Sequence, residues 1–300
     1  YICSANTIYG KKSLVKHLKQ NDYNLDYIIK HQEAVKELSN MQDFANEIET
    51  LSYLTKENKK KNINKEIKKF IEVCEDETPN QVKLNKILMI VLPAILIAVL
   101  ALCLIGINRA FYFNVLKVVI IINLLLAFLN MQKSTSILLP IGDFYKNIKV
   151  YENIFKEIDK QDFESSYLKE LKEGLNKEGG SLKAIKELKK IGSYIDLRQN
   201  FVANIILNAI VLWDFYCIDM FDKWKKSYGK NIRTYLEIVG EIEALISLAS
   251  ITYVRDDYTF AKVNECDDLK PEIDFKNLKH PLIKIEDAVG NGITLKGQTC

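Results

Sequence analysis

Two apolar runs in the middle of the chain constrain its fold more than any other feature of the sequence. The first, Ile87 to Ile107, carries no charge and matches the ~20 residues that a helix needs to cross a ~30 Å hydrocarbon core. The second, Phe111 to Leu129, has a similar length and follows the polar pair Asn108-Arg109. Inside lipid each backbone amide must be paired within its own segment, so the sequence predicts a two-helix transmembrane hairpin within residues 81–133.

The alternative is a buried helical hairpin inside a soluble core, which Asn114, Lys117 and Asn123 in the second run favour. Against it, neither run has a polar face at helical spacing. Lys117 can also extend toward the end of the hairpin that carries Arg109. We therefore predict a membrane hairpin, with a kink at Pro93, where one backbone donor is missing.

Basic residues predict the orientation of this hairpin. Lysines are dense before the first run and recur after the second, whereas the turn offers only Arg109 and, nearby, Lys117. The flanking lysines are Lys59, Lys60, Lys61, Lys65, Lys68, Lys69, Lys83 and Lys86 before the hairpin, and Lys133, Lys146 and Lys149 after it. Because cytoplasmic flanks carry the excess of Lys and Arg, both termini should be cytoplasmic and the tip outside.

The start of the chain and its cysteines fit a cytoplasmic location. Residues 1–80 are charged and amphipathic, without a cleavable signal, and the chain begins at Tyr1, so we expect an excised piece of a longer protein. The cysteines are scattered singly, and none forms a Cys-x-x-Cys pair or has a histidine at metal spacing. They are Cys3, Cys74, Cys103, Cys217, Cys266 and Cys300. Neither a zinc site nor a disulfide framework is predicted.

Outside the hairpin the sequence predicts mostly helices, because only 5 prolines and 12 glycines interrupt it. Apolar spacing predicts two or three helices over 11–54, the second beginning near Asn24 or Asp26. Further helices are predicted over 144–158, 167–175, 181–191 and 232–253. Ser181 is predicted to cap the third of these. Alternating apolar residues and glycines after Pro271 predict short strands near 273–275, 282–285 and 289–295.

The segment Asp196 to Met220 is strongly apolar and leaves two interpretations open. It is long enough for a third membrane span. Charged residues bracket its apolar centre, namely Asp196, Arg198, Asp214 and Asp219. Because carboxylates near lipid are costly, we predict a buried helix of the soluble part instead.

The sequence contains no autonomous catalytic set. Its three histidines, His17, His31 and His280, have no nucleophile in a recognisable pattern beside them. Glu237, Glu241 and Glu243 could form an acid/base group on one helix face, but such spacing is routine on solvated or salt-bridged helices. No phosphate loop occurs, so this chain alone is not expected to hydrolyse nucleotide.

The lysine-dense segment from Lys56 to Lys69 also has two interpretations. It could bind nucleic acid or anionic lipid, to which lysines near a bilayer contribute roughly 1 kcal/mol each. The simpler interpretation is a solvated helix face, which we prefer. The net charge of +3 is too small to indicate a nucleic-acid partner by itself.

Three blocks in order resemble MutS-like proteins, the DNA mismatch repair family of ATPases. The first runs from Tyr9-Gly10-Lys11-Lys12-Ser13-Leu14 to His31-Gln32-Glu33-Ala34-Val35 and is similar to the start of the family's helical core, with His31 in place of the usual arginine. The second, Glu241-Ile242-Glu243-Ala244-Leu245-Ile246-Ser247-Leu248-Ala249, is similar to the helix that returns from the lever to the ATPase. The third joins His280-Pro281-Leu282-Ile283 to Val289-Gly290-Asn291-Gly292-Ile293-Thr294-Leu295 and resembles the strands before the phosphate loop.

More narrowly, the chain resembles the membrane-anchored branch of this family, in which a transmembrane hairpin interrupts the helical core. Trp213-Asp214 and Lys223-Trp224-Lys225-Lys226-Ser227-Tyr228-Gly229 have counterparts in its later helices. The resemblance implies a mainly α fold. A helical core/lever domain (1–80 and 134–262) would be interrupted by the hairpin (81–133) and followed by the first short strands of a truncated α/β ABC-type ATPase domain (263–300).

The resemblance also implies what the full-length protein binds. It would be a homodimeric ATPase that uses ATP and Mg²⁺, with its phosphate loop and metal-binding acid downstream of Cys300. Ala288, Val289, Asn291 and His280 would lie at the edge of the adenine pocket, without the aromatic ring that relatives stack on the base. For His280-Pro281, a turn that positions a strand is the simpler role, and no cofactor is expected on this chain alone.

DNA binding is possible by resemblance but not supported by the residues. Phe70-Ile71-Glu72 matches the letters of the family's mismatch-reading Phe-x-Glu motif, yet it lies directly before the hairpin and is better explained by chance. The alternatives to a membrane-bound ATPase are a non-enzymatic helical membrane scaffold and a soluble DNA clamp.

Overall fold

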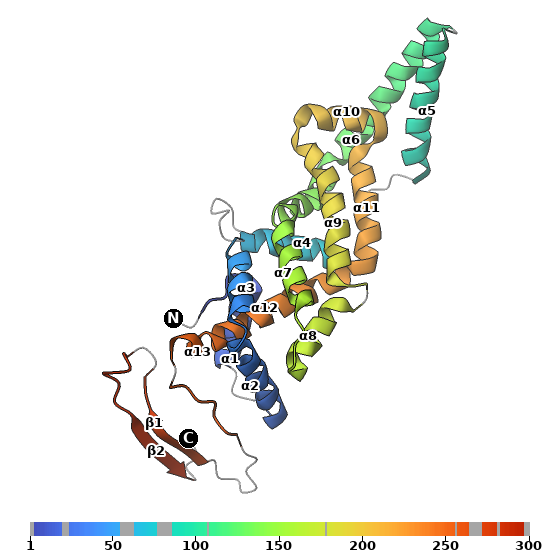
Figure 1. Ribbon diagram of the computed structural model, residues 1–300. Helices are drawn as coiled ribbons and strands as arrows, with labels where there is room; N and C mark the ends of the chain where they lie inside the picture. The colour runs from blue at the N-terminus through green and yellow to red at the C-terminus, as the bar shows by residue number, and fades with distance from the viewer. Residues whose placement is uncertain are drawn as a thin grey trace. The chain divides into compact units, whose positions relative to one another are not determined.

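The computed structural model describes residues 3–19, 24–54, 63–76, 86–106, 108–177, 179–255, 257–263, 272–280 and 283–296. Over these residues the chain is mainly helical, with a two-stranded sheet near its C-terminus (Figure 1). It divides into unit 1 (Tyr1–Glu49, Gln161–Leu171, Val239–Cys300) and unit 2 (Thr50–Lys160, Lys172–Ile238). Several residues in the predictions above lie outside the described residues, namely Lys56, Lys59, Lys60, Lys61, Lys83, Ile107, Cys266, Pro281, Leu282 and Cys300.

The elements follow one another as in Figure 1. The first helices are α1 (Ile8–Lys19), α2 (Leu25–Ser39), α3 (Gln42–Leu54), α4 (Ile63–Glu75), α5 (Lys86–Ile105), α6 (Arg109–Tyr145) and α7 (Ile148–Lys160). They are followed by α8 (Ser166–Asn176), α9 (Ser181–Asp196), η1 (Leu197–Gln199), α10 (Phe201–Val211), α11 (Trp213–Tyr228), η2 (Gly229–Asn231), α12 (Ile232–Ala249) and α13 (Ile251–Val254). The strands are β1 (Glu272–Leu278) and β2 (Asn291–Lys296).

The first three helices confirm the prediction for residues 11–54. The side chain of Asn24 accepts a hydrogen bond from the backbone N–H of Tyr27 at 2.8 Å, which caps α2 at the predicted start. Leu38, Ile48 and Ala34 are fully or almost fully buried in unit 1. The apolar spacing along these helices therefore marks their buried faces.

The C-terminal strands pair in an antiparallel ladder, with Ile273 opposite Leu295 and Phe275 opposite Ile293. The register is irregular between Phe275 and Leu278, where Asn277 has a positive φ of 57°. The strand predicted near 282–285 is wrong for its described part. The N–H of Ile283 donates to the carbonyl of His280, and that of Asp287 to Lys284, so local turns occupy these groups.

In unit 2 an aromatic stack forms part of the core. Phe70 stacks on Phe144 with ring centroids 4.1 Å apart, and Phe144 lies 5.6 Å from Tyr151. Phe70 is fully buried, so the Phe70-Ile71-Glu72 segment cannot present a wedge to DNA in this fold. The neighbouring Lys68 and Lys69 are exposed on α4, in agreement with the solvated-face interpretation for this part of the lysine-rich segment.

Two helix boundaries of unit 2 differ from the predictions. The helix expected over 144–158 is divided, because α6 ends at Tyr145 and the N–H of Asn147 donates to the carbonyl of Phe144 before α7 begins. Ser181 is the first residue of α9, and Gly180 takes the N-cap position in its place. Gly180 precedes it with a φ of 78°, a conformation that glycine adopts without strain.

The apolar segment 196–220 is not one straight helix, although its two helices are together apolar enough for a broken span or a re-entrant loop. It forms α10 and the first half of α11, which meet at Leu212 with a bend of 82°. Leu212 has a left-handed conformation, with φ 54° and ψ 51°. Phe215, Cys217 and Ile218 of α11 are buried as predicted, whereas one side of α10 is exposed.

Candidate functional site

The hairpin of α5 and α6 is apolar and largely uncovered. The residues from Ile87 to Ile105 and the helix from Arg109 to Tyr145 are long and apolar enough to cross a membrane. Only 17% of the most apolar stretch of the first helix and 11% of that of the second are buried. Ile90, Ile97, Leu104 and Phe128 are each more than 60% exposed. The alternative of a hairpin wrapped by the rest of the chain is therefore wrong.

The tip of the hairpin is polar, and the two basic residues of this part of α6, Arg109 and Lys117, lie near it. Gly106 and Asn108, on either side of the turn, have positive φ angles of 91° and 39°, which reverse the chain over a few residues. Lys117 places its ammonium group 4.7 Å from the ring centroid of Phe113, one turn nearer the tip. This side chain extends toward Arg109, as its spacing along the helix predicts.

Asn123 explains why a polar side chain occurs inside the apolar run of α6. It is fully buried, and its Nδ2 donates to the carbonyl of Ala209 at 2.7 Å. This carbonyl lies in the last turn of α10, where the bend at Leu212 leaves backbone acceptors without helical partners. Asn123 therefore binds the end of α10 to the hairpin.

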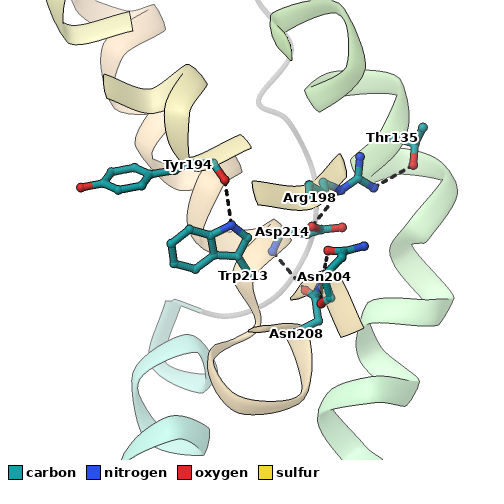
Figure 2. Close-up of polar contacts among 7 residues, drawn as sticks. All are labelled: Thr135, Tyr194, Arg198, Asn204, Asn208, Trp213 and Asp214. Carbon is teal, nitrogen blue, oxygen red and sulfur yellow. Dashed lines mark hydrogen bonds and ion pairs between the residues drawn. The ribbon is translucent and has the colours of Figure 1, made fainter. Parts of the chain in front are cut away.

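A buried ion pair joins the same region to α6 (Figure 2). Arg198 Nε donates to Asp214 Oδ1 at 2.9 Å, and Arg198 Nη2 donates to Thr135 Oγ1 at 2.9 Å. Side-chain exposure is 14% for Arg198 and 5% for Asp214, so the pair is largely desolvated. These residues come from η1, α11 and α6, three elements that the pair holds together.

Three further hydrogen bonds fix the corner between α10 and α11 (Figure 2). The N–H of Asp214 donates to Asn208 Oδ1 at 3.1 Å, while Asn208 Nδ2 donates to the side-chain oxygen of Asn204 at 2.7 Å. Trp213 Nε1 donates to the carbonyl of Tyr194 at 3.0 Å. The backbone amide of Asp214, in the first turn of α11, thus has an acceptor despite the bend.

Apolar packing completes this polar base of the hairpin. Leu92 of α5, Leu212 and Phe215 form a buried cluster, with Met89 and Leu126 packed against it. α10 contacts both hairpin helices. Its opposite side exposes only apolar side chains, namely Phe201 (76%), Val202 (63%), Ile205 (41%), Ile206 (51%) and Ile210 (40%). Their spacing places them along one side of the helix.

The residues predicted for the edge of an adenine pocket lie near the sheet of unit 1. Asn291 is the first residue of β2 and pairs in register with Leu278 of β1. His280 follows β1 by two residues and is exposed, as is Val289 at 78%, while Ala288 is partly buried. The structure brings Asn291 and His280 to the same end of the strand pair.

The first and second blocks of the family resemblance pack together in unit 1. Glu243 Oε1 accepts from the N–H groups of Asn6 at 2.9 Å and Thr7 at 3.2 Å, and its Oε2 accepts from the hydroxyl of Thr7. A Cβ at Gly10 would overlap Glu243, and a Cβ at Gly240 would overlap the backbone of Tyr9. The close crossing of α1 and α12 requires glycine at both positions.

Glu241, next to this crossing, has a separate set of partners. His17 Nε2 lies 2.8 Å from Glu241 Oε1, the hydroxyl of Tyr167 donates to the same oxygen at 3.0 Å, and Ser13 donates to Oε2. Burial raises the pKa of Glu241, but the interactions with the imidazoles of His17 and His31 outweigh it and hold this pKa well below its ordinary value. Glu237 is exposed, so the three glutamates do not form one acid/base group.

Sequence reasoning missed most of these polar contacts. Ser13 and His17 share one face of α1, but Glu241 lies more than 200 positions away and no local pattern connects them. In the sequence, Arg198 and Asp214 are recognisable only as charges that flank an apolar segment. Cys3, Cys74, Cys103 and Cys217 are free among the described residues.

The chain matches no protein-family model, no curated protein and no solved structure.

Proposed function

We propose that this chain is the membrane anchor and helical lever of a MutS-like ABC-type ATPase. The observation that carries the proposal is the convergence of the resembling blocks. The segment around Gly10 contacts Glu243 and Gly240, and His31 of the same block lies 3.6 Å from Glu241. Segments more than 200 residues apart in the chain therefore meet through the residues that carry the resemblance.

This junction has the properties of a mechanical connection. Glu243 is buried and accepts hydrogen bonds from two backbone amides and one hydroxyl, which fixes the start of α1 on α12. Nucleotide binding by a downstream ATPase domain would move α12 and, with it, the elements held at this junction. Such coupling requires that the nucleotide favour one of two arrangements of the helices.

In this proposal α5 and α6 cross the bilayer with both termini in the cytoplasm and the tip outside. At ~1.5 Å per residue, roughly 22 Å of helix separates Asn108 at the tip from Asn123, where α10 is bound. This is less than the ~30 Å thickness of the hydrocarbon core. The contact with α10 would then lie just inside its cytoplasmic edge, with the exposed apolar side of α10 against lipid, as in interfacial helices.

In this proposal β1 and β2 are the first strands of an ATPase domain that continues after β2. Ile273, Ile293 and Leu295 of the strand pair are each more than 40% exposed. A two-stranded sheet is marginally stable by itself, and further strands of an α/β domain would bury these side chains. ATP and Mg²⁺ would bind in that domain, which would also form the homodimer. His280, Ala288, Val289 and Asn291 would border the base.

The decisive experiment uses the intact protein. The coding sequence beyond Cys300 is expected to contain a Gly-rich loop with Gly-Lys-Ser/Thr within a few tens of codons. ATP turnover is then measured in detergent and in lipid nanodiscs, for the wild type and for a variant that replaces the lysine of this loop by alanine. We expect turnover that the substitution abolishes. If the loop is absent, or if both proteins turn over ATP only at the same background rate, the ATPase proposal is wrong. The alternative of a non-enzymatic helical membrane scaffold would then hold.

The lever is tested by a matched pair of glutamate variants. Glu243→Gln weakens the buried junction, whereas Glu237→Gln changes an exposed residue on the same helix. We expect Glu243→Gln to reduce the nucleotide-dependent change in hydrogen exchange at α1, and Glu237→Gln to leave it unchanged. Equal responses of the two variants would contradict a transmission role for Glu243.

A further inference from the structure

Three helices of unit 1 bring two histidines and a glutamate to one point. His17 comes from α1, His31 from α2 and Glu241 from α12, and one nitrogen or oxygen of each lies within 4.8 Å of the others. Their side chains are 9%, 11% and 15% exposed. These are ligands of the types that transition-metal ions prefer, and they are nearly enclosed.

The hydrogen bond of His31 to its own helix defines which of its nitrogens is available. Nδ1 lies 2.7 Å from the carbonyl of Tyr27 and must carry the proton, because a carbonyl only accepts. In a neutral ring Nε2 then carries a lone pair. It is shielded from solvent, has no hydrogen-bond partner among the described residues, and lies 3.6 Å from Glu241 Oε1.

A lone pair facing a carboxylate oxygen is repulsive unless a cation lies between them. Glu241 Oε1 lies 2.8 Å from His17 Nε2 and accepts from the hydroxyl of Tyr167 at 3.0 Å, and neither of these interactions places a proton between Oε1 and His31 Nε2. The cation is either a proton on His31 or a metal ion shared by the three side chains. A metal-binding histidine typically donates its other ring N–H to a carbonyl or carboxylate, and His31 does so to Tyr27.

We propose that His17, His31 and Glu241 bind a divalent transition-metal ion, with Zn²⁺ as the best fit. Ligands of a tetrahedral Zn²⁺ site at ~2.1 Å from the metal lie roughly 3.4 Å apart. His31 Nε2 lies 3.6 Å from Glu241 Oε1, and His17 Nε2 lies 2.8 Å from the same oxygen, so the ion would displace the hydrogen bond between His17 and Glu241 and release its proton. Ca²⁺ and Mg²⁺ fit poorly because they require oxygen ligands. A water molecule or Ser13 completes the coordination, and Tyr167 orients the carboxylate from outside it.

The bound ion would connect α1, α2 and α12 at a point next to the junction formed by Glu243. Its role is independent of nucleotide hydrolysis, because no ligand comes from the region after β1. No local sequence pattern indicates such a site, since the two histidines are not spaced as a metal motif and the carboxylate is distant along the chain.

The test is a metal titration of the full chain in detergent. The protein carries a purification tag without histidine, and Cys3, Cys266 and Cys300 are replaced by serine to remove competing thiols. After chelation, Zn²⁺ binding is measured by calorimetry, and Co²⁺ binding by visible absorption. We expect one ion per chain, a tetrahedral Co²⁺ spectrum and a higher unfolding temperature with Zn²⁺.

Two ligand variants are compared with one control. His31→Gln and Glu241→Gln should each weaken Zn²⁺ binding more than ~10-fold, whereas His280→Gln, at an exposed histidine of the same unit, should not. Circular dichroism checks that the variants remain folded. If the parent protein binds no Zn²⁺, or if His31→Gln binds it as tightly as His280→Gln, the site is a protonated histidine–glutamate network and the metal proposal is wrong.

Discussion

At the scale of single residues, the tightest constraints lie where backbones cross. Gly240 lies against Tyr9 and the N–H of Gly10, so an added Cβ would overlap main-chain atoms that cannot rotate away. Gly142, by contrast, faces only a methyl group of Ile195 at 3.4 Å. Both glycines are inside helices, which makes them a matched pair.

We predict that Gly240→Ala destabilises the protein by about 1–3 kcal/mol, because α1 and α12 must separate. Gly142→Ala should be neutral or stabilising by up to about 1 kcal/mol, since alanine favours helix. Denaturant titration in detergent measures both. A similar effect of the two substitutions would show that the α1–α12 crossing can relax.

The pair Arg198–Asp214 makes a second prediction. Arg198→Ala leaves the carboxylate of Asp214 buried without its partner, so we expect a loss of about 3–5 kcal/mol in the free energy of unfolding. The double variant Arg198→Met, Asp214→Leu removes both charges and should recover a large part of this loss. Unfolding in the same detergent compares the proteins. A smaller loss for Arg198→Ala than for the double variant would mean that water replaces the ion pair.

A third prediction concerns acid stability. Hydrogen bonds from Lys156 and Lys189 hold the pKa of Glu152 below its ordinary value. Because the folded pKa is lower than the unfolded one of ~4.3, this stabilisation is fully present above ~4.3 and is lost as pH falls through the folded pKa. It should amount to less than about 1 kcal/mol per lysine, because both lysines are half exposed.

Glu152→Gln should therefore make the protein less stable at pH 7 but reduce the loss of stability between pH 5 and pH 3. Glu173→Gln, at an exposed glutamate of the same unit, serves as the control. Thermal unfolding at each pH gives the comparison. If Glu152→Gln loses as much stability between pH 5 and pH 3 as the wild type does, the acid sensitivity arises from other carboxylates.

At the scale of elements, α10 shows how a short helix can be apolar without being buried. Its inner side is held by Asn123 and by the corner at Leu212, whereas its outer side presents Phe201 and Ile206 to the surroundings. An 11-residue helix is too short to span a bilayer. Its length and exposed face suit a position along the membrane surface.

We predict that a fluorescent label at Ile206→Cys is quenched by lipids that carry a quencher in their acyl chains. A label at Ser227→Cys, exposed at the far end of α11, should not be. Both variants are made without other cysteines and reconstituted in vesicles. If aqueous iodide quenches the label at 206 as strongly as the label at 227, α10 does not lie in the bilayer.

Helical spacing was sufficient to predict most helices, but not their corners. Asn24 has a local signal because its side chain caps the amides that directly follow it. The bend at Leu212 has none, since a leucine in a left-handed conformation depends on contacts from Asn123 and Asn208. The turn at 283–287 was predicted as strand because alternation of apolar residues does not show where backbone groups find partners.

At the scale of the whole molecule, the lysines that flank the hairpin predict which side of a membrane each part occupies. We predict that Asn108→Cys, at the tip, reacts with a membrane-impermeant maleimide in intact cells. Lys16→Cys, exposed on α1, should react only after permeabilisation. Both are made in a cysteine-free background. Labelling of Lys16→Cys in intact cells would reverse the topology predicted from the lysine distribution.

The sequence by itself determined the apolar helical hairpin, long enough to cross a membrane, and the helical class, because uncharged length and apolar spacing are local properties of the chain. It also indicated strands after Pro271, and β1 and β2 are present. Only the tertiary structure decided which polar groups meet. Glu243 with Thr7, Arg198 with Asp214, and Glu241 with His17 and His31 are each joined by folding, since their partners lie on other elements. Buried polar groups must find such partners, and the chain pattern does not identify them.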